Sequence, residues 1–168
     1  DADVTIDGGT TALIIAASTI DGDLTLTSGN SSGITDDGTV TVGGNFSATT
    51  DANNGVINVG TMAVDGTVAL NTNGNGAATI VNDAGLNFAA STVGGALSAT
   101  ATTANITDSG ALAITGTTTL VTSADDATIA LDGATNAFTG AMTIATNDSS
   151  GTDADVTIDG GTTALVIA

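Results

Sequence analysis

The stretch TVTVGGNFSATT, residues 39–50, contains the pattern that decides the fold. Val40 and Val42 alternate with threonines, a glycine pair follows, and Phe46 and Ala48 then alternate with serine and threonine. Apolar residues at every second position predict a strand with one buried face and one solvated face. The glycine pair predicts a tight turn. Residues 39–50 therefore predict two short strands joined by a turn.

The same strand–turn–strand pattern occurs six times, each time around one turn glycine. We take these turn glycines as equivalent: Gly22, Gly44, Gly66, Gly95, Gly116 and Gly140. The position two residues before them is apolar in every copy, and the position two residues after them is apolar in all copies except the one with Thr118. The predicted core columns are Ile20, Val42, Val64, Val93, Ile114 and Phe138 before the glycine, and Leu24, Phe46, Val68, Leu97 and Met142 after it. Recurring columns predict a repeat protein whose units share one core.

A longer period encloses these units. Residues 1–16, DADVTIDGGTTALIIA, recur as DADVTIDGGTTALVIA at 153–168, an offset of 152 residues with one difference in sixteen positions. We expect residues 1–168 to be one continuous slice of a tandem array. In this interpretation residues 1–152 are one period, and residues 153–168 start the next.

The 152-residue period divides further into two diverged halves. AASTIDG at 16–22 returns as AASTVGG at 89–95, and ITDDG at 34–38 returns as ITDSG at 106–110. Each half contains three of the six turn glycines. The period is therefore predicted to consist of two three-coil halves.

Units of this length with several short strands are typical of a parallel β-solenoid, in which each unit is one coil. The predicted fold class is all-β, a parallel β-helix with about six coils per 152-residue repeat. Coils of this kind stack at the strand spacing of about 4.8 Å. A membrane β-barrel would need strands of about 9–11 residues and aromatic girdles. A curli-like amyloid would need glutamine ladders, and the chain has no glutamine and three phenylalanines as its only aromatic residues.

The composition excludes several classes of function. All 18 charged side chains are aspartates, and the formal net charge is −18. Phosphate backbones and anionic lipids would be repelled, so we expect no nucleic-acid partner. No apolar run approaches the roughly 20 residues of a spanning helix, so we expect no membrane insertion. The chain lacks His, Cys, Lys and Arg, the side chains on which most catalytic sites depend. A pair of aspartates could act as in glycosidases, but it would lack aromatic side chains to hold the sugar rings. We therefore expect that the protein is not an enzyme and that it has no catalytic residues and no organic cofactor.

Calcium is the one cofactor that the acidic composition leaves open. An Asn/Asp column stands eight residues before the turn glycines and includes Asp36, Asp108 and Asp132. If Asp108 and Asp132 stack on adjacent coils, their repulsion favours a cation between them. Turn aspartates that splay apart are the alternative. The candidate metal site is a weak structural calcium site at these three aspartates.

Threonine pairs suggest a remote alternative, an ice-binding solenoid with a flat threonine grid. Thr25 with Thr27 fits such a grid, but Ala69 with Asn71 and other pairs interrupt it in half of the units. Threonine on the solvated face of a strand is also explained by β-propensity alone.

The chain resembles filamentous-haemagglutinin-like bacterial surface proteins in phrases such as VGGNFSATT (42–50), VDGTVALNTNG (64–74) and ITDSGALAITGTTTL (106–120). The resemblance lies in the repeating pattern of the sequence and in its composition, and it covers nearly the whole chain. It implies a right-handed parallel β-helix at the bacterial cell surface or in the extracellular space, with roles in adhesion or filament formation. It supplies no binding residues.

We therefore expect a self-stacking, non-catalytic segment of a long extracellular filament or adhesin stalk. Its predicted partners are further copies of the same repeat end to end, with lateral neighbours in a fibre or lattice. The alternative from the binding class is a calcium-dependent surface-layer or adhesin module.

Overall fold

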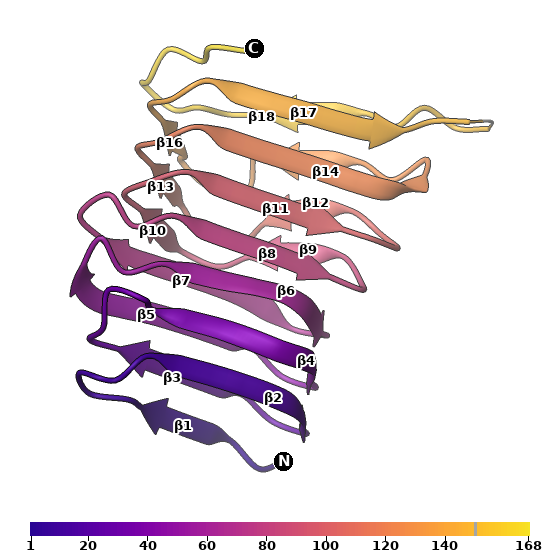
Figure 1. Ribbon diagram of the computed structural model, residues 1–168. Coiled ribbons are helices and arrows are strands. Elements are labelled where there is room, and N and C mark those ends of the chain that lie inside the picture. Colours follow the sequence, from indigo (N-terminus) through magenta and orange to yellow (C-terminus); the bar gives the residue numbers. More distant parts are fainter. Residues whose placement is uncertain (150) are drawn as a thin grey trace.

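The computed structural model describes residues 1–149 and 151–168, and the secondary structure of these residues consists of strands and turns. The strands form two sheets that face each other across a common core (Figure 1). The main path of sheet A contains β1 (Val4–Asp7), β3 (Leu24–Ser28), β5 (Phe46–Asn53), β7 (Thr67–Asn73), β9 (Leu86–Phe88), β12 (Ile106–Asp108), β15 (Ile129–Leu131) and β18 (Val156–Ile158). Three short strands extend it: β10 (Ser91–Val93), β13 (Leu112–Ile114) and β16 (Ala137–Phe138). Sheet B contains β2 (Leu13–Ile20), β4 (Ile34–Val42), β6 (Ile57–Val64), β8 (Ala78–Asn82), β11 (Leu97–Ala101), β14 (Thr118–Asp125) and β17 (Met142–Asn147).

The chain winds as a parallel β-solenoid, as the alternating pattern predicted. Strands pair in parallel with the strand one coil away, for example Leu24 with Phe46 in sheet A and Ile34 with Ile57 in sheet B. Figure 1 shows sheet B in front, running to the right, and sheet A behind, running to the left, while the chain climbs from its N-terminus to its C-terminus. The winding is therefore right-handed, as parallel crossovers nearly always are.

The 152-residue repeat spans seven coils, so the expected number of six is wrong. Val4 lies in β1 and its repeat equivalent, Val156, lies in β18. The path of sheet A from β1 to β18 runs through β3, β5, β7, β9, β12 and β15, which makes seven steps.

The count differs because the six turn glycines belong to two separate stacks. The amide of Gly66 donates to the carbonyl of Gly44 at 3.0 Å, and the amide of Gly44 donates to Gly22 at 3.0 Å. The amide of Gly95 donates instead to Gly76, at 2.8 Å. Gly76 belongs to the turn after β7, whereas Gly66 precedes β7, so the interval from Gly66 to Gly95 covers one and a half coils.

The two stacks lie at opposite edges of the solenoid. The first three turn glycines lie in connections that lead from sheet B to sheet A, and the last three lie in connections that lead from sheet A to sheet B. Both stacks need glycine because the backbone one coil below is too close for a side chain. A Cβ on Gly116, for example, would lie 2.4 Å from the carbonyl carbon of Gly95.

The predicted core columns are buried, but each column is divided between the two sheets. All eleven of the residues assigned to these columns have at most 9% of their surface exposed. Ile20, Val42 and Val64 stack in sheet B, whereas Val93, Ile114 and Phe138 stack in sheet A. The columns after the glycine divide in the opposite sense: Leu24, Phe46 and Val68 lie in sheet A, and Leu97, Thr118 and Met142 lie in sheet B.

The two halves of the period are consequently related by half a turn. AASTIDG at 16–22 ends strand β2 of sheet B, and AASTVGG at 89–95 contains strand β10 of sheet A. Each half spans three and a half coils instead of the expected three, and equivalent residues fall on opposite sides of the core.

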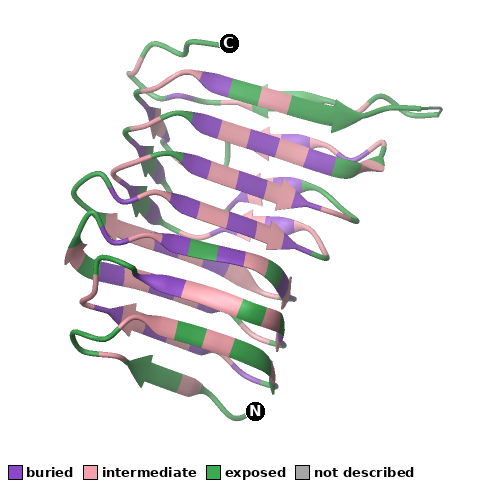
Figure 2. Ribbon diagram, viewed as in Figure 1, coloured by how far each residue is buried: buried purple, intermediate pink, exposed green. Residues whose placement is uncertain are grey.

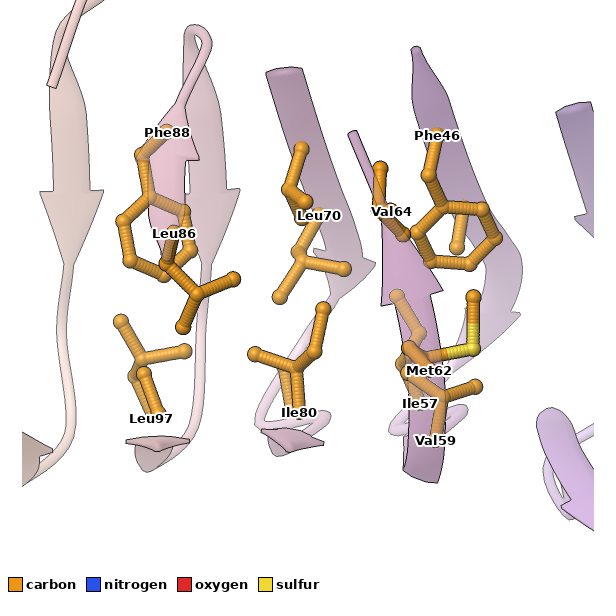
Figure 3. Close-up of a cluster of buried hydrophobic side chains, with 14 of the residues drawn as sticks. Phe46, Ile57, Val59, Met62, Val64, Leu70, Ile80, Leu86, Phe88 and Leu97 are labelled. Carbon is orange, nitrogen blue, oxygen red and sulfur yellow. The ribbon is translucent and has the colours of Figure 1, made fainter. Parts of the chain in front are cut away.

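The core is a stack of aliphatic and phenylalanine side chains between the sheets. Figure 3 shows Phe46, Leu70 and Phe88 of sheet A facing Met62 and Ile80 of sheet B. Buried and half-buried residues alternate along the inner strands, while β1 and β17 at the two ends are mostly exposed (Figure 2). A buried side chain of this size contributes about 1.5–3 kcal/mol. No coil achieves that burial without a neighbour on each side.

A buried asparagine joins the two halves. Strand β6 extends to Val64, but strand β8 above it ends at Asn82 and leaves the last residues of β6 without a partner strand. The Asn82 side chain accepts from the Val64 amide at 2.8 Å and donates to the carbonyls of Val64 at 3.0 Å and Gly85 at 2.7 Å. The amide side chain thus replaces a missing strand.

Candidate functional site

Asp36 and Asp108, two of the predicted calcium ligands, both cap the backbone of the next coil. Asp36 Oδ1 accepts from the Gly60 amide at 2.9 Å, and Asp108 Oδ1 accepts from the Gly133 amide at 2.8 Å. Their second oxygens are also used, by Thr61 in one half and Asn136 in the other. The same Asp-to-Gly hydrogen bond therefore occurs in both halves, in sheet B in the first and sheet A in the second.

The third predicted ligand, Asp132, is not placed beside the other two. Ile106 pairs with Ile129 and Thr107 with Ala130, so the register sets Asp108 opposite Leu131. Asp132 comes one residue later and is exposed, whereas Asp108 is 9% exposed. The expected stacked pair of carboxylates is not formed, because adjacent positions on a strand point to opposite faces.

The structure instead brings together Asp125, Asp126 and Asp148. One carboxylate oxygen of each lies within 4.8 Å of the others. Asp125 ends β14, Asp126 follows it, and Asp148 follows β17 one coil above. The site predicted from the sequence does not include this group, although the offset of 22 residues between Asp126 and Asp148 matches one coil and is a signal for it.

The loop after β17 supplies donors to two of these carboxylates. Asp125 Oδ1 accepts from the Ser149 amide at 2.6 Å, and Asp126 Oδ2 accepts from the Thr152 amide at 3.3 Å. Asp126 Oδ1 is buried and has no hydrogen-bond partner in the described part of the chain. Carboxylate oxygens are hard ligands suited to calcium, but calcium takes about six to eight oxygens, so these three groups fall short of a complete coordination shell.

The equivalent corner of the first half has a similar backbone, with Asn53, Asn54 and Gly74 in place of Asp125, Asp126 and Asp148. Asn54 and Asp126 both have positive φ, 62° and 60°. The Asn54 amide donates to Asn73 at 2.9 Å, and the Asp126 amide donates to Asn147 at 3.0 Å. The corner therefore forms with neutral or with acidic side chains, and its fold does not require the charge.

The aspartates are concentrated at one edge of the solenoid. We define the acidic edge as residues 1–3 and the connections that lead from sheet B to sheet A; the other connections, from sheet A to sheet B, form the neutral edge. The acidic edge contains ten of the 18 aspartates, at positions 1, 3, 21, 23, 65, 83, 126, 148, 153 and 155. The connections of the neutral edge contain one, Asp159, whose Oδ1 accepts from the Gly161 amide at 2.7 Å. In Figure 1 the acidic edge is on the right and the neutral edge on the left.

A hollow of about 300 Å³ opens on the acidic edge where the two halves meet. Asp65, Gly85, Asn87 and Asn105 are among the residues that line it. Asn87 Oδ1 is buried without a hydrogen-bond partner among the described residues. The hollow is large enough for several water molecules, and its lining mixes apolar side chains such as Val64 and Leu86 with the polar ones.

The threonine pairs do not form a grid on a single face. Thr25 and Thr27 lie on sheet A, whereas Ser98 and Thr100 lie on sheet B. The half-turn between the two halves distributes these pairs over opposite faces, so neither sheet presents all of them.

Among the described residues there is no helix long and apolar enough to cross a membrane. The fold and the stacked turns define the class as a repeat protein built on a parallel β-solenoid. The chain belongs to the family described as "Repeats of unknown function (DUF5649)", whose model matches residues 1–58 and 75–145. The two matched stretches begin 74 residues apart, close to the spacing of the two halves. No curated protein and no solved structure matches the chain.

Proposed function

We propose that this protein is a rod-forming structural segment of a long extracellular filament or adhesin stalk, in which successive repeats continue one solenoid. The equivalence of residues 1–16 and 153–168 carries the proposal. Both segments form the same turn: Asp7 Oδ1 accepts from the Gly9 amide at 2.8 Å, and Asp159 Oδ1 accepts from the Gly161 amide at 2.7 Å. Gly9 and Gly161 both have positive φ, 55° and 61°.

The outermost coils have the open surfaces that such a continuation needs. Ile6 is 37% exposed while Leu26, its partner in the next coil, is 1% exposed. Val156 is 42% exposed while Ile129 beneath it is 0% exposed. A further coil would cover these apolar residues and pair the free strand edges. Copies of the same repeat, end to end, are the partner that fits this surface in shape and register.

The resemblance to filamentous-haemagglutinin-like surface proteins supports the cell-surface location and the role in adhesion or filament formation. The absence of His, Cys, Lys and Arg supports a non-catalytic role. Antibody labelling of intact cells tests the location: labelling of lysed cells alone would contradict it.

Extension of the array tests the rod. Because residues 153–168 repeat residues 1–16, a chain lengthened after residue 168 by a second copy of residues 17–168 should continue the same solenoid. Seven more coils should lengthen the particle by about 34 Å with no change in its cross-section. Small-angle X-ray scattering measures both quantities, and two bodies joined by a flexible hinge would contradict the proposal.

A calcium-dependent surface-layer or adhesin module is the second candidate, favoured by the close approach of Asp125, Asp126 and Asp148. This candidate requires that calcium raise the thermal unfolding midpoint and that a chelator reverse the increase. An unchanged midpoint at millimolar calcium would contradict it.

A further inference from the structure

The two edges of the solenoid are built from equivalent sequence, yet they differ in charge. The half-turn relation places each connection of the first half at one edge and its equivalent in the second half at the other edge. Among the residues of the connections between strands, six equivalent pairs contain one aspartate: Asp21 and Gly94, Asp23 and Ala96, Asp65 and Thr139, Asp83 and Thr10, Asp126 and Asn54, and Asp148 and Gly74. In all six the aspartate is the member at the acidic edge, and the neutral residue is the member at the neutral edge.

At Gly94 and Gly74 the close backbone or side chain of the neighbouring coil excludes a side chain, so there the fold itself requires a neutral residue. At the other four pairs no such clash causes the separation. Asn54 and Asp126, for example, have nearly the same φ and the same backbone hydrogen bond, so these two corners would accept either residue. A random distribution of aspartates between equivalent corners would give similar charges at both edges. The connections of the neutral edge contain only Asp159, although Asp7 ends β1 and Asp51 lies two residues before the end of β5, both next to this edge.

We propose that the neutral edge is a lateral contact surface for a second copy of this chain, so that two rods pair edge to edge with their acidic edges outward. The proposal rests on the rod architecture proposed above. Electrostatic repulsion selects the edge. The edges are separated by strands of 5–9 residues, or roughly 17–30 Å, whereas the Debye length at physiological ionic strength is about 8 Å. Contact through the neutral edge therefore screens the aspartates of one rod from those of the other.

The size of the surface predicts weak pairing of single copies and stronger pairing of longer arrays. Seven coils provide an edge about 34 Å long and about 10 Å wide, or roughly 340 Å². A stable interface buries about 800 Å² on each partner. One period falls short of this area, and about two and a half periods would reach it.

Two double variants with the same net charge test the choice of edge. Ala96→Asp with Thr139→Asp places two charges on the neutral edge, at exposed positions whose equivalents are Asp23 and Asp65. Ala104→Asp with Asn105→Asp places two charges on the acidic edge, also at exposed positions. Circular dichroism verifies that both variants keep the β-rich fold.

Sedimentation equilibrium and small-angle scattering of the full chain, at concentrations up to about 1 mM in 0.15 M NaCl, supply the readout. We expect the wild type and the acidic-edge variant to gain mass and cross-section with concentration, and the neutral-edge variant to associate at least tenfold more weakly. A wild type that stays monomeric, equal weakening in both variants, or undiminished association of the neutral-edge variant would overturn the proposal. Growth in length at constant cross-section would support end-to-end stacking and would equally overturn lateral pairing.

Discussion

Asn54 and Asp126, 72 residues apart in the chain, are the two non-glycine residues with positive φ among the described residues, and they lie at opposite edges of the solenoid. Each follows a strand whose threonine side chain spans the turn. Thr50 Oγ1 donates to the Gly55 carbonyl at 3.0 Å, and Thr122 Oγ1 donates to the Ala127 carbonyl at 3.1 Å. One turn design is therefore used twice, rotated by half a turn around the core.

Substitution of Asn54 should show the cost of its backbone conformation. Asn54→Ala should lower the free energy of unfolding by about 1–2 kcal/mol relative to Asn54→Gly, because only the alanine is strained in the left-handed region. Both variants lose the hydrogen bond from the Asn75 amide to Asn54 Oδ1. The difference between their free energies of unfolding therefore isolates the cost of the backbone conformation. Urea unfolding monitored by circular dichroism measures it, and equal midpoints for the two variants would contradict the assigned φ.

Thr118 is a buried threonine in an otherwise apolar column, and replacement by valine should stabilise the protein. Its side chain is 0% exposed, and Oγ1 has no hydrogen-bond partner among the described residues. Thr118→Val should raise the free energy of unfolding by about 1 kcal/mol, since an unsatisfied buried hydroxyl is removed at nearly constant shape. Thr122→Val is the matched control and should destabilise, because its hydroxyl is bonded to Ala127. A loss of stability in Thr118→Val would disprove the assignment.

The glycine stacks should not tolerate a methyl group. A Cβ on Gly116 would approach the Gly95 backbone to 2.4 Å, whereas a Cβ on Gly60 would have nothing within 4 Å. Gly116→Ala should therefore cost about 1–3 kcal/mol through overpacking. Gly60→Ala should leave the unfolding midpoint nearly unchanged. Thermal denaturation distinguishes the two, and equal effects would argue against close stacking of the coils.

Asn82 should be far more sensitive to truncation than an exposed asparagine. Asn82→Ala leaves the Val64 amide and two carbonyls without partners, at a cost of about 1–3 kcal/mol for each buried group left unsatisfied. Asn58 is exposed on the outer face of sheet B, and Asn58→Ala should have little effect. Hydrogen exchange should also show the Val64 amide losing protection in the Asn82 variant but not in the Asn58 variant.

Neutralising the carboxylates at the second-half corner should stabilise the fold at low ionic strength. The double variant Asp125→Asn with Asp126→Asn copies the pair Asn53 and Asn54 of the first half. Like charges about 4 Å apart repel by about 1 kcal/mol in water, which corresponds to roughly 2–4 °C in a protein of this size. The gain should shrink in 1 M NaCl because salt screens the repulsion. A gain that does not depend on salt would contradict an electrostatic origin.

Local alternation predicted the strands, their inner faces and all eleven assigned core residues, because a side-chain period of two depends on neighbouring residues alone. The number of coils depends on which edge each turn occupies. A glycine that permits close stacking has the same signature at either edge, so Gly66 and Gly95 could not be distinguished by sequence. The interval of 29 residues between them was the available signal, since one coil of the observed register takes about 19–27 residues.

The candidate calcium ligands show the same limit of prediction from sequence alone. Asp36 and Asp108 share a sequence motif, which sequence comparison could detect. In the structure both accept a hydrogen bond from a glycine amide of the next coil. Asp132 is displaced because β12 and β15 pair at an offset of 23 residues (Ile106 with Ile129), whereas Asp108 and Asp132 are 24 residues apart. The group formed by Asp125, Asp126 and Asp148 depends on contact between coils, which became predictable only with the correct coil length.

The half-turn relation between the two halves also constrains how an array of these repeats can change its copy number. Insertion or deletion of a single half would rotate everything beyond it by 180°, and the acidic edge would continue as the neutral one. Insertion of two halves restores the original orientation. Recombination that preserves the charge pattern should therefore change array length in whole periods of 152 residues. Whether the number of inserted or deleted halves is even or odd, and not the length alone, then decides which variants remain functional.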